Sequence, residues 1–255
     1  MLLGTSAAQA DCTLLVDAAT KRVLHEDGAC DARLTPASTF KVALSLMGFD
    51  AGVLKSEHVP LLDWRPGDVD WNPAWKAPTD PARWISLSVV WYSVRTTHAL
   101  GMAQVRHYLD AFDYGNRDFS GRPGQPDGLD GAWIASSLRI SPREQAAFLG
   151  RLVRRELPVS AHAFDMTARV TDLGPLPGAP AWTIHGKTGA AAPHDAHDEP
   201  DWNHGIGWFV GWATRGGRSV VFVRQIQDAT ERQPSPGLRA KAAFLEALPA
   251  LLPRD

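Results

Sequence analysis

Strand-like segments gather at the two ends of this chain, and helix-like segments fill its middle. Apolar runs typical of strands occur at residues 13–17 and 22–25, and again at 181–187, 205–213 and 219–226. Residues 40–49 are apolar on every face, which is typical of a helix buried on all sides. A sheet built from both ends of a chain must therefore accommodate a helical insertion.

Three further helices are predicted from periodicity and end signals. Residues 98–112 form one amphipathic pattern, with polar residues between apolar ones. Residues 141–155 begin with the Ser-Pro-Arg-Glu start of a capping box. Residues 235–251 open with Pro236 and carry an apolar face that can cover a sheet. The polar stretch 190–204 indicates a long loop.

These elements predict an α+β fold with two lobes. Residues 11–39 and 178–255 would form a mixed lobe, in which terminal helices flank a mainly antiparallel sheet. Residues 40–177 would form an inserted, all-helical lobe.

Composition narrows the classes of function. The 255 residues are 44% hydrophobic and 21% charged, as in ordinary globular proteins. The net charge of −2 is too small to indicate a nucleic-acid partner. No apolar run is long enough to span a membrane. Residues 1–10 end in Ala-Gln-Ala and are interpreted as a residual signal peptide, with a plain disordered terminus as the alternative.

Two cysteines, Cys12 and Cys30, flank the predicted N-terminal hairpin. Pairing of its strands could bring the two thiols within disulfide distance. In an oxidising compartment we expect a disulfide, and two free thiols are the alternative.

Four short motifs occur in a fixed order: SxxK at residues 38–41, SxV at 88–90, YGN at 114–116 and KTG at 187–189. A shuffled chain of this composition would contain SxxK about a third of the time, so that motif is weak alone. YGN is far rarer, at roughly a few per thousand shuffled chains. The ordered set is therefore the strongest functional signal in the chain.

Ser38 and Lys41 are the candidate nucleophile and base. A spacing of three residues places both side chains on one face of a helix, where the amine can reach the hydroxyl. Apolar neighbours should depress the pKa of Lys41, because desolvation disfavours the charged amine. The alternative is an N-cap serine followed by a surface lysine.

The remaining motifs suggest supporting roles. Ser88 could relay a proton between Lys41 and a leaving nitrogen, although an N-cap serine is the alternative. Tyr114 begins a tight turn that could wall a cleft or be a plain surface turn. Lys187, Thr188 and Gly189 end a strand and could hold an anionic substrate closely.

The loop at residues 193–204 contains three histidines among carboxylates. Its spacing fits no standard zinc pattern, so we expect a solvated loop and no metal.

With these motifs the chain resembles the class D (oxacillinase-type) serine β-lactamases. The match extends from about Cys12 to Arg239 and includes the runs at 111–113, 133–141 and 207–212. The chain has SxV where other serine acyltransferases have SDN. The resemblance implies hydrolysis of β-lactams such as penicillins and oxacillin, through an acyl-enzyme on Ser38.

The resemblance also implies that CO₂ carbamylates Lys41, which then serves as general base in both acylation and deacylation. No other cofactor is implied. Trp133 matches the family tryptophan that holds the carbamate, and only a neutral Lys41 amine could add CO₂.

Other matches supply the rest of the expected site. The backbone N–H groups of Ser38 and Ala190 would form the oxyanion hole. Lys187, Thr188 and Arg239 would bind the substrate carboxylate. Gly189, Tyr114, Val90 and Ile134 complete the expected substrate contacts. Relatives often have an aromatic residue at the position of Ala190, so the resemblance does not determine the shape of the cleft or the range of substrates.

We expect a periplasmic enzyme. Two alternatives stay open. One is a penicillin-binding or β-lactam sensor domain, which is acylated but not turned over. The other is a secreted binding protein on the same fold with a silent site.

Overall fold

The computed structural model describes residues 11–253, and the predicted signal peptide lies outside them. Six strands form one antiparallel sheet in the order β2-β1-β6-β5-β4-β3. The strands are β1 (Cys12–Asp17), β2 (Val23–Gly28), β3 (Asp172–Leu176), β4 (Ala179–Ala191), β5 (Ile206–Arg215) and β6 (Arg218–Gln227). Both ends of the chain therefore contribute to one sheet, and the predicted α+β class is confirmed.

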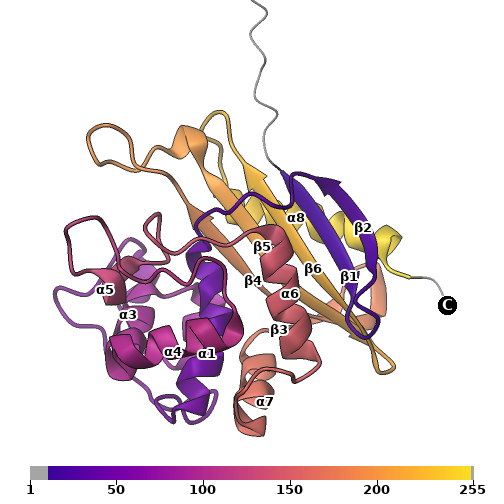
Figure 1. The fold of residues 1–255 in the computed structure, drawn as a ribbon, viewed down its shortest axis with the longest axis horizontal. Coiled ribbons are helices and arrows are strands. Elements are labelled where there is room, and N and C mark those ends of the chain that lie inside the picture. Colours follow the sequence, from indigo (N-terminus) through magenta and orange to yellow (C-terminus); the bar gives the residue numbers. More distant parts are fainter. Residues whose placement is uncertain (1–10, 254–255) are drawn as a thin grey trace, which may run out of the picture.

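Helices cover both faces of this sheet and form the insertion beside it (Figure 1). The α-helices are α1 (Phe40–Asp50), α2 (Pro81–Leu87), α3 (Val90–Leu100), α4 (Met102–Phe112), α5 (Gly128–Gly131), α6 (Pro142–Val153), α7 (Ala161–Val170) and α8 (Pro236–Leu251). Three short 3₁₀ helices are η1 (Ala37–Thr39), η2 (Pro73–Trp75) and η3 (Trp202–His204). The lobe boundaries that we predicted stay a prediction.

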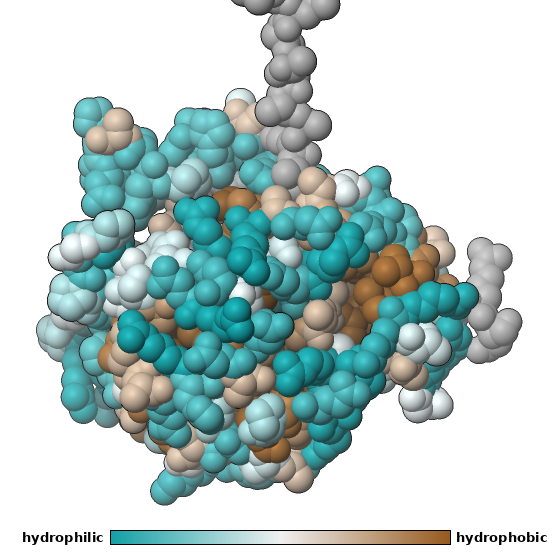
Figure 2. Space-filling model, viewed as in Figure 1, coloured by the Kyte–Doolittle hydropathy of each residue, from teal (hydrophilic) through white to brown (hydrophobic). Residues whose placement is uncertain are grey.

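Two cores lie on opposite faces of the sheet. On one face, α8 packs Phe244 against Phe222 of β6, with ring centroids 4.8 Å apart. On the other face, α6 packs on β1, β5 and β6, and α1 lies in the same large core. Every residue of α1 from Phe40 to Phe49 is buried, as its uniformly apolar sequence predicted. On the face shown in Figure 2, apolar side chains are confined to separate patches among hydrophilic ones.

Two predicted elements differ from the structure. The single helix expected at residues 98–112 is wrong: Gly101, with φ +78°, separates α3 from α4. Glycine adopts such a φ without strain, whereas other residues do not, so one helix can end and the next can begin at Gly101. The amphipathic pattern continues across this break and therefore did not reveal it. The loop expected at 190–204 begins later, because β4 continues to Ala191 and pairs it with Ile206.

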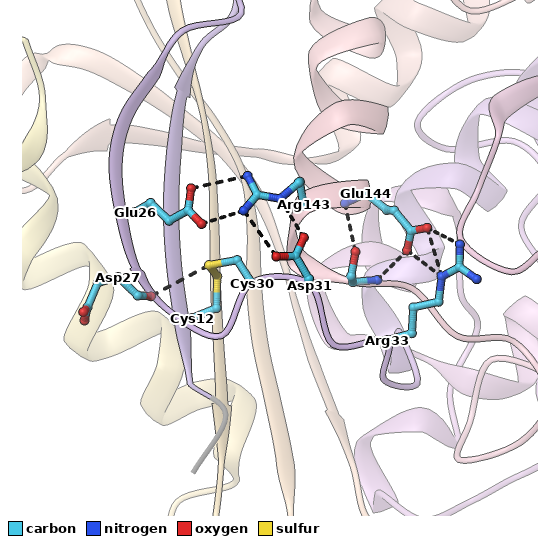
Figure 3. A network of polar contacts seen from close by, with 9 residues as sticks. Cys12, Glu26, Asp27, Cys30, Asp31, Arg33, Arg143 and Glu144 are labelled. Atoms are coloured by element: carbon cyan, nitrogen blue, oxygen red, sulfur yellow. Dashed lines mark hydrogen bonds and ion pairs between the residues drawn. A yellow bond between two sulfur atoms is a disulfide. The ribbon is translucent and has the colours of Figure 1, made fainter. Parts of the chain in front are cut away.

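The disulfide between Cys12 and Cys30 is present, with the two Cα atoms 5.2 Å apart. Figure 3 shows how the start of α6 is tied to this hairpin: the Arg143 guanidinium lies between Glu26 and Asp31. The Arg143 backbone N–H also donates to the Cys30 carbonyl at 3.0 Å. The predicted capping box is confirmed, because Ser141 and Glu144 each accept a backbone hydrogen bond from the other residue.

Candidate active site

Ser38 lies in η1, at the junction where the chain enters the buried helix α1. Lys41 Nζ lies 3.0 Å from Ser38 Oγ, within hydrogen-bond distance. The i, i+3 spacing that suggested this contact is thus realised across the join between the two helices. The pair has the geometry of a nucleophile and its base.

Lys41 is completely buried, among the apolar residues of α1. Burial holds the pKa of its amine well below the usual value, and the charge of Lys187 lowers that pKa further. An amine of lowered pKa is available in the neutral form, which can accept a proton.

Lys187 lies on β4 and is only 4% exposed. Burial, followed by the charge of Lys241, lowers its pKa to about 7. Its Nζ donates to the Thr188 carbonyl at 3.0 Å and lies 3.3 Å from Thr188 Oγ1. These contacts hold the amine at the strand and away from solvent. At the strand, the amine could bind an anion that enters the site.

Gly189 brings β4 against the turn that carries Ser38. A Cβ atom built at Gly189 would lie 2.9 Å from the Pro36 carbonyl oxygen and 3.2 Å from the Thr39 nitrogen. Only a residue without a side chain permits so close an approach of two backbones. The first and last motifs, about 150 residues apart in sequence, therefore meet directly.

Ser88 links α2 to α3 and has a left-handed backbone, with φ 59° and ψ 37°. Strained conformations of this kind often occur at functional sites. The alternative that Ser88 is an N-cap is wrong, because Val89 is the N-cap of α3. Val90, the last residue of the motif, is buried and lines the cavity described below.

Tyr114 is completely buried and packs its ring edge-on against Phe40 and Phe148, at centroid distances of 5.7 and 5.1 Å. Asn116 fixes the following chain by donating to the Ser137 carbonyl and accepting from the Arg139 N–H. The triplet is therefore a packed turn behind the nucleophile, and Tyr114 exposes no surface to a ligand.

Trp133 is also completely buried. Its ring stacks on Phe40 at 5.6 Å and on Phe119 at 5.9 Å, so it packs against the residue that precedes Lys41. Its carbonyl accepts a hydrogen bond from Thr35 Oγ1 at 2.8 Å. These contacts connect the Trp133 segment to the chain just before Ser38.

Arg239 is not gathered with the other predicted site residues. Its guanidinium pairs with Asp228 and donates to the Pro234 carbonyl, and it lines a separate cavity of about 250 Å³. The backbone nearby does approach the site: a Cβ atom at Gly237 would lie 2.4 Å from the Gly189 carbonyl oxygen. The N-terminus of α8 therefore borders the KTG strand, while the Arg239 side chain is held by Asp228.

A cavity of about 760 Å³ brings together three predicted residues, Val90, Ile134 and Ala190. Its wall also includes two exposed tryptophans that the sequence analysis missed, Trp71 and Trp202. Exposure of a tryptophan depends on tertiary packing, so no local pattern distinguished these two from buried ones.

The histidine-rich loop pairs several of its charged groups with one another, and Asp198 also pairs with Arg122 outside the loop. His194 pairs with Asp198, His204 pairs with Asp201, and Asp195 accepts backbone hydrogen bonds from His197 and Glu199. Within residues 11–253, no cluster of His, Cys, Asp or Glu side chains is arranged to hold a metal ion. Over the same range, no helix is both long and apolar enough to cross a membrane.

Known proteins resemble this chain over nearly its whole length. Residues 11–248 match the penicillin-binding protein transpeptidase domain family. The chain is 40% identical over 246 residues to the β-lactamase OXA-9 of Klebsiella pneumoniae, covering 94% of this chain and 88% of the relative. It is 33% identical to the β-lactamase OXA-1 of Escherichia coli over 243 residues, covering 94% and 84%.

A solved structure, the class D β-lactamase OXA-427, superposes with a TM-score of 0.87 at 44% identity, covering 95% of this chain and all of that one. The fold thus places the chain in the penicillin-binding protein transpeptidase family. Within it, the chain belongs to the class D β-lactamases. The resemblance and the enzyme class predicted from the ordered motifs are confirmed.

Proposed function

We propose that this enzyme hydrolyses β-lactams with Ser38 as nucleophile and Lys41 as general base. The contact between Lys41 Nζ and Ser38 Oγ at 3.0 Å carries this proposal. A lysine with a lowered pKa can take the serine proton as Ser38 attacks the lactam carbonyl. Ser88, on its strained turn, would then relay a proton to the leaving nitrogen.

Lys41 also fits the carbamate that CO₂ would form, because its buried amine favours the neutral form that such a reaction requires. When bound, the carbamate would supply a carboxylate base in place of an amine. Ser38 and the Trp133 indole would hold it. We expect activity to fall in degassed acidic buffer and to return with bicarbonate. Indifference to bicarbonate would contradict this assignment.

The backbone N–H groups of Ser38 and Ala190 would stabilise the oxyanion that develops on the lactam carbonyl. Two observations support this pairing. Gly189 touches the turn that contains Ser38, and Ala190 is the next residue and lines the cavity. The two N–H groups come from different segments, so their spacing depends on that close contact.

Lys187 and Thr188 would bind the substrate carboxylate. The negative charge of the carboxylate would raise the pKa of Lys187 and favour its protonated form. Val90, Ile134 and Gly189 would bound the apolar part of the substrate. Arg239, which is already paired with Asp228, would join them through its remaining guanidinium N–H groups. The buried Tyr114 would support the site by packing rather than by contact with the substrate.

Mass spectrometry of rapidly quenched mixtures with a penicillin tests the nucleophile. We expect an adduct on the wild type and none on Ser38→Ala. Ser45→Ala is the matched control, because Ser45 is a buried serine of α1 that donates only to the Lys41 carbonyl. An adduct on Ser38→Ala would overturn the assignment.

Turnover separates hydrolysis from the two rivals. Sustained nitrocefin hydrolysis is the expected result. A burst of one equivalent without further turnover would indicate a sensor or penicillin-binding domain. Neither a burst nor turnover, with Ser38→Ala indistinguishable from the wild type in every measured activity, would indicate a binding protein with a silent site.

We further propose a periplasmic location. The Cys12–Cys30 disulfide supports it, since such bonds persist in oxidising compartments. Fractionation of cells that express the full chain tests the location, and recovery only in the cytoplasm would contradict it.

A further inference from the structure

Behind the Ser38 turn lies a small buried polar group, the Thr39 cluster, formed by Thr39, Tyr114 and Gln145. Thr39 and Gln145 are each 1% exposed, and Tyr114 is completely buried. Gln145 comes from α6, whereas Thr39 follows the nucleophile and Tyr114 belongs to the YGN turn. Buried polar side chains of this kind are costly unless they form hydrogen bonds, so their arrangement is informative.

The hydrogen bonds in the cluster have a fixed direction. Thr39 Oγ1 donates its single proton to the Pro36 carbonyl at 2.6 Å. It must therefore accept from Gln145 Nε2, which lies 2.8 Å away. These two hydrogen bonds join α6 to Pro36, the first residue of the turn, through the Thr39 hydroxyl group.

The turn itself is strained and is contacted by two elements that lie far apart in sequence, β4 and α6. Ala37, directly before Ser38, has φ +48°, a conformation that residues with side chains rarely adopt. Gly189 of β4 approaches the Pro36 carbonyl and the Thr39 backbone. Gln145 of α6 holds the Thr39 hydroxyl. A strained turn persists only when its surroundings over-determine it.

Tyr114 adds the packing around this contact. Its hydroxyl lies beside Thr39 and Gln145 but makes no hydrogen bond of good geometry. Its ring fills the space between Phe40 and Phe148 of α6. The ring thus supports α6 against α1 at the level of Gln145.

We propose that Gln145 is a positioning residue, which holds the turn at residues 36–39 so that Ser38 keeps its hydroxyl and backbone N–H aligned for attack. The inference rests on the proposed function of Ser38. Gln145 is only 1% exposed, so its side chain offers almost no surface to a substrate. Its effect should therefore fall on the rate of acylation rather than on substrate binding.

Gln145→Met keeps the length of the side chain and removes its donor. Stopped-flow acylation should show the first-order rate constant falling roughly tenfold. This loss corresponds to a displacement of Ser38 by about 0.5 Å, on the rule that a 1 Å misplacement costs about 10²-fold. The dissociation constant of the initial complex should stay unchanged. The matched control is Gln225→Met, because Gln225 is also a 1% exposed glutamine but lies on β6, two strands from Gly189. It should leave the acylation rate unchanged and should not lower the melting temperature, because Gln225 Nε2 makes no hydrogen bond within the described residues.

A second pair of variants keeps the test decisive if Gln145→Met does not fold. Thr39→Val preserves shape and removes the hydroxyl, whereas Thr39→Ser preserves the hydroxyl. We expect slow acylation in the first and near-normal acylation in the second.

An acylation rate within twofold of wild type in both Gln145→Met and Thr39→Val would overturn the inference. Equal slowing by Gln225→Met would also overturn it, because the effect would then be a general loss of packing. Acylation of Ser38→Ala would instead refute the proposed nucleophile, so the two failures are distinguishable.

Discussion

Replacing Gly189 with alanine would place a methyl group between β4 and the turn that carries Ser38. The new Cβ would lie 2.9 Å from the Pro36 carbonyl oxygen and 3.1 Å from Thr39 Cγ2. The first distance is about half an ångström short of ordinary contact, so the strand and the turn must separate by roughly that amount. Overpacking of this kind typically costs about 1–3 kcal/mol of unfolding free energy.

The same displacement should lower activity. A shift of about half an ångström between Ser38 and the KTG strand should cost roughly tenfold in kcat/KM, on the rule of about 10²-fold per ångström. Nitrocefin hydrolysis measures kcat/KM, and urea unfolding measures the stability of the same sample.

Gly186→Ala is the matched control on the same strand. Its Cβ would lie 2.9 Å from Phe209 Cε2 and 3.1 Å from the Val210 carbonyl oxygen, in the core under α8 and away from the turn. We expect a similar loss of stability with kcat/KM within about twofold of wild type. Equal losses of activity in both variants, or full activity in Gly189→Ala, would refute the reasoning.

Three other predictions concern stability and the cavity. Replacing Cys12 and Cys30 by alanine removes a cross-link between residues 18 apart in sequence. Urea denaturation should show that the unfolding free energy falls by about 3 kcal/mol, because the unfolded chain regains loop-closure entropy. A fall of less than about 1 kcal/mol would argue against this prediction. The pKa of Lys187 is lowered to about 7, so the folded state binds fewer protons than the unfolded chain above that pH, and unfolding free energy should rise from pH 7 to 10. Lys187→Met should flatten this rise by up to about 1.4 kcal/mol per pH unit, and an unchanged slope would contradict the assignment. Trp202→Ala removes apolar contact at the cavity wall. It should raise KM roughly fivefold, which is about 1 kcal/mol of binding free energy, for substrates with bulky apolar side chains, and should leave KM unchanged for substrates with small side chains. Equal changes of KM for the two kinds of substrate would exclude a role of Trp202 in substrate choice.

Local sequence patterns determined much of the fold. The uniformly apolar run of α1 predicted a buried helix, because no face of such a helix is suited to water. The capping box at Ser141 predicted where α6 begins, because its bonds join residues only three apart. The edge strand β3 was missed, since its Asp-Leu-Gly-Pro-Leu sequence has no strand character and pairing with β4 imposes the conformation.

The contacts of the site also fall into those that local sequence spacing predicts and those that it does not. The three-residue spacing of Ser38 and Lys41 determined their contact, because one helical turn brings such side chains together. Only the tertiary structure decided that Gly189 touches the Ser38 turn, that Asp228 holds Arg239, and that Gln145 lies behind the nucleophile. These contacts join residues far apart in sequence, and their geometry follows from how the sheet and helices pack, which no local spacing encodes.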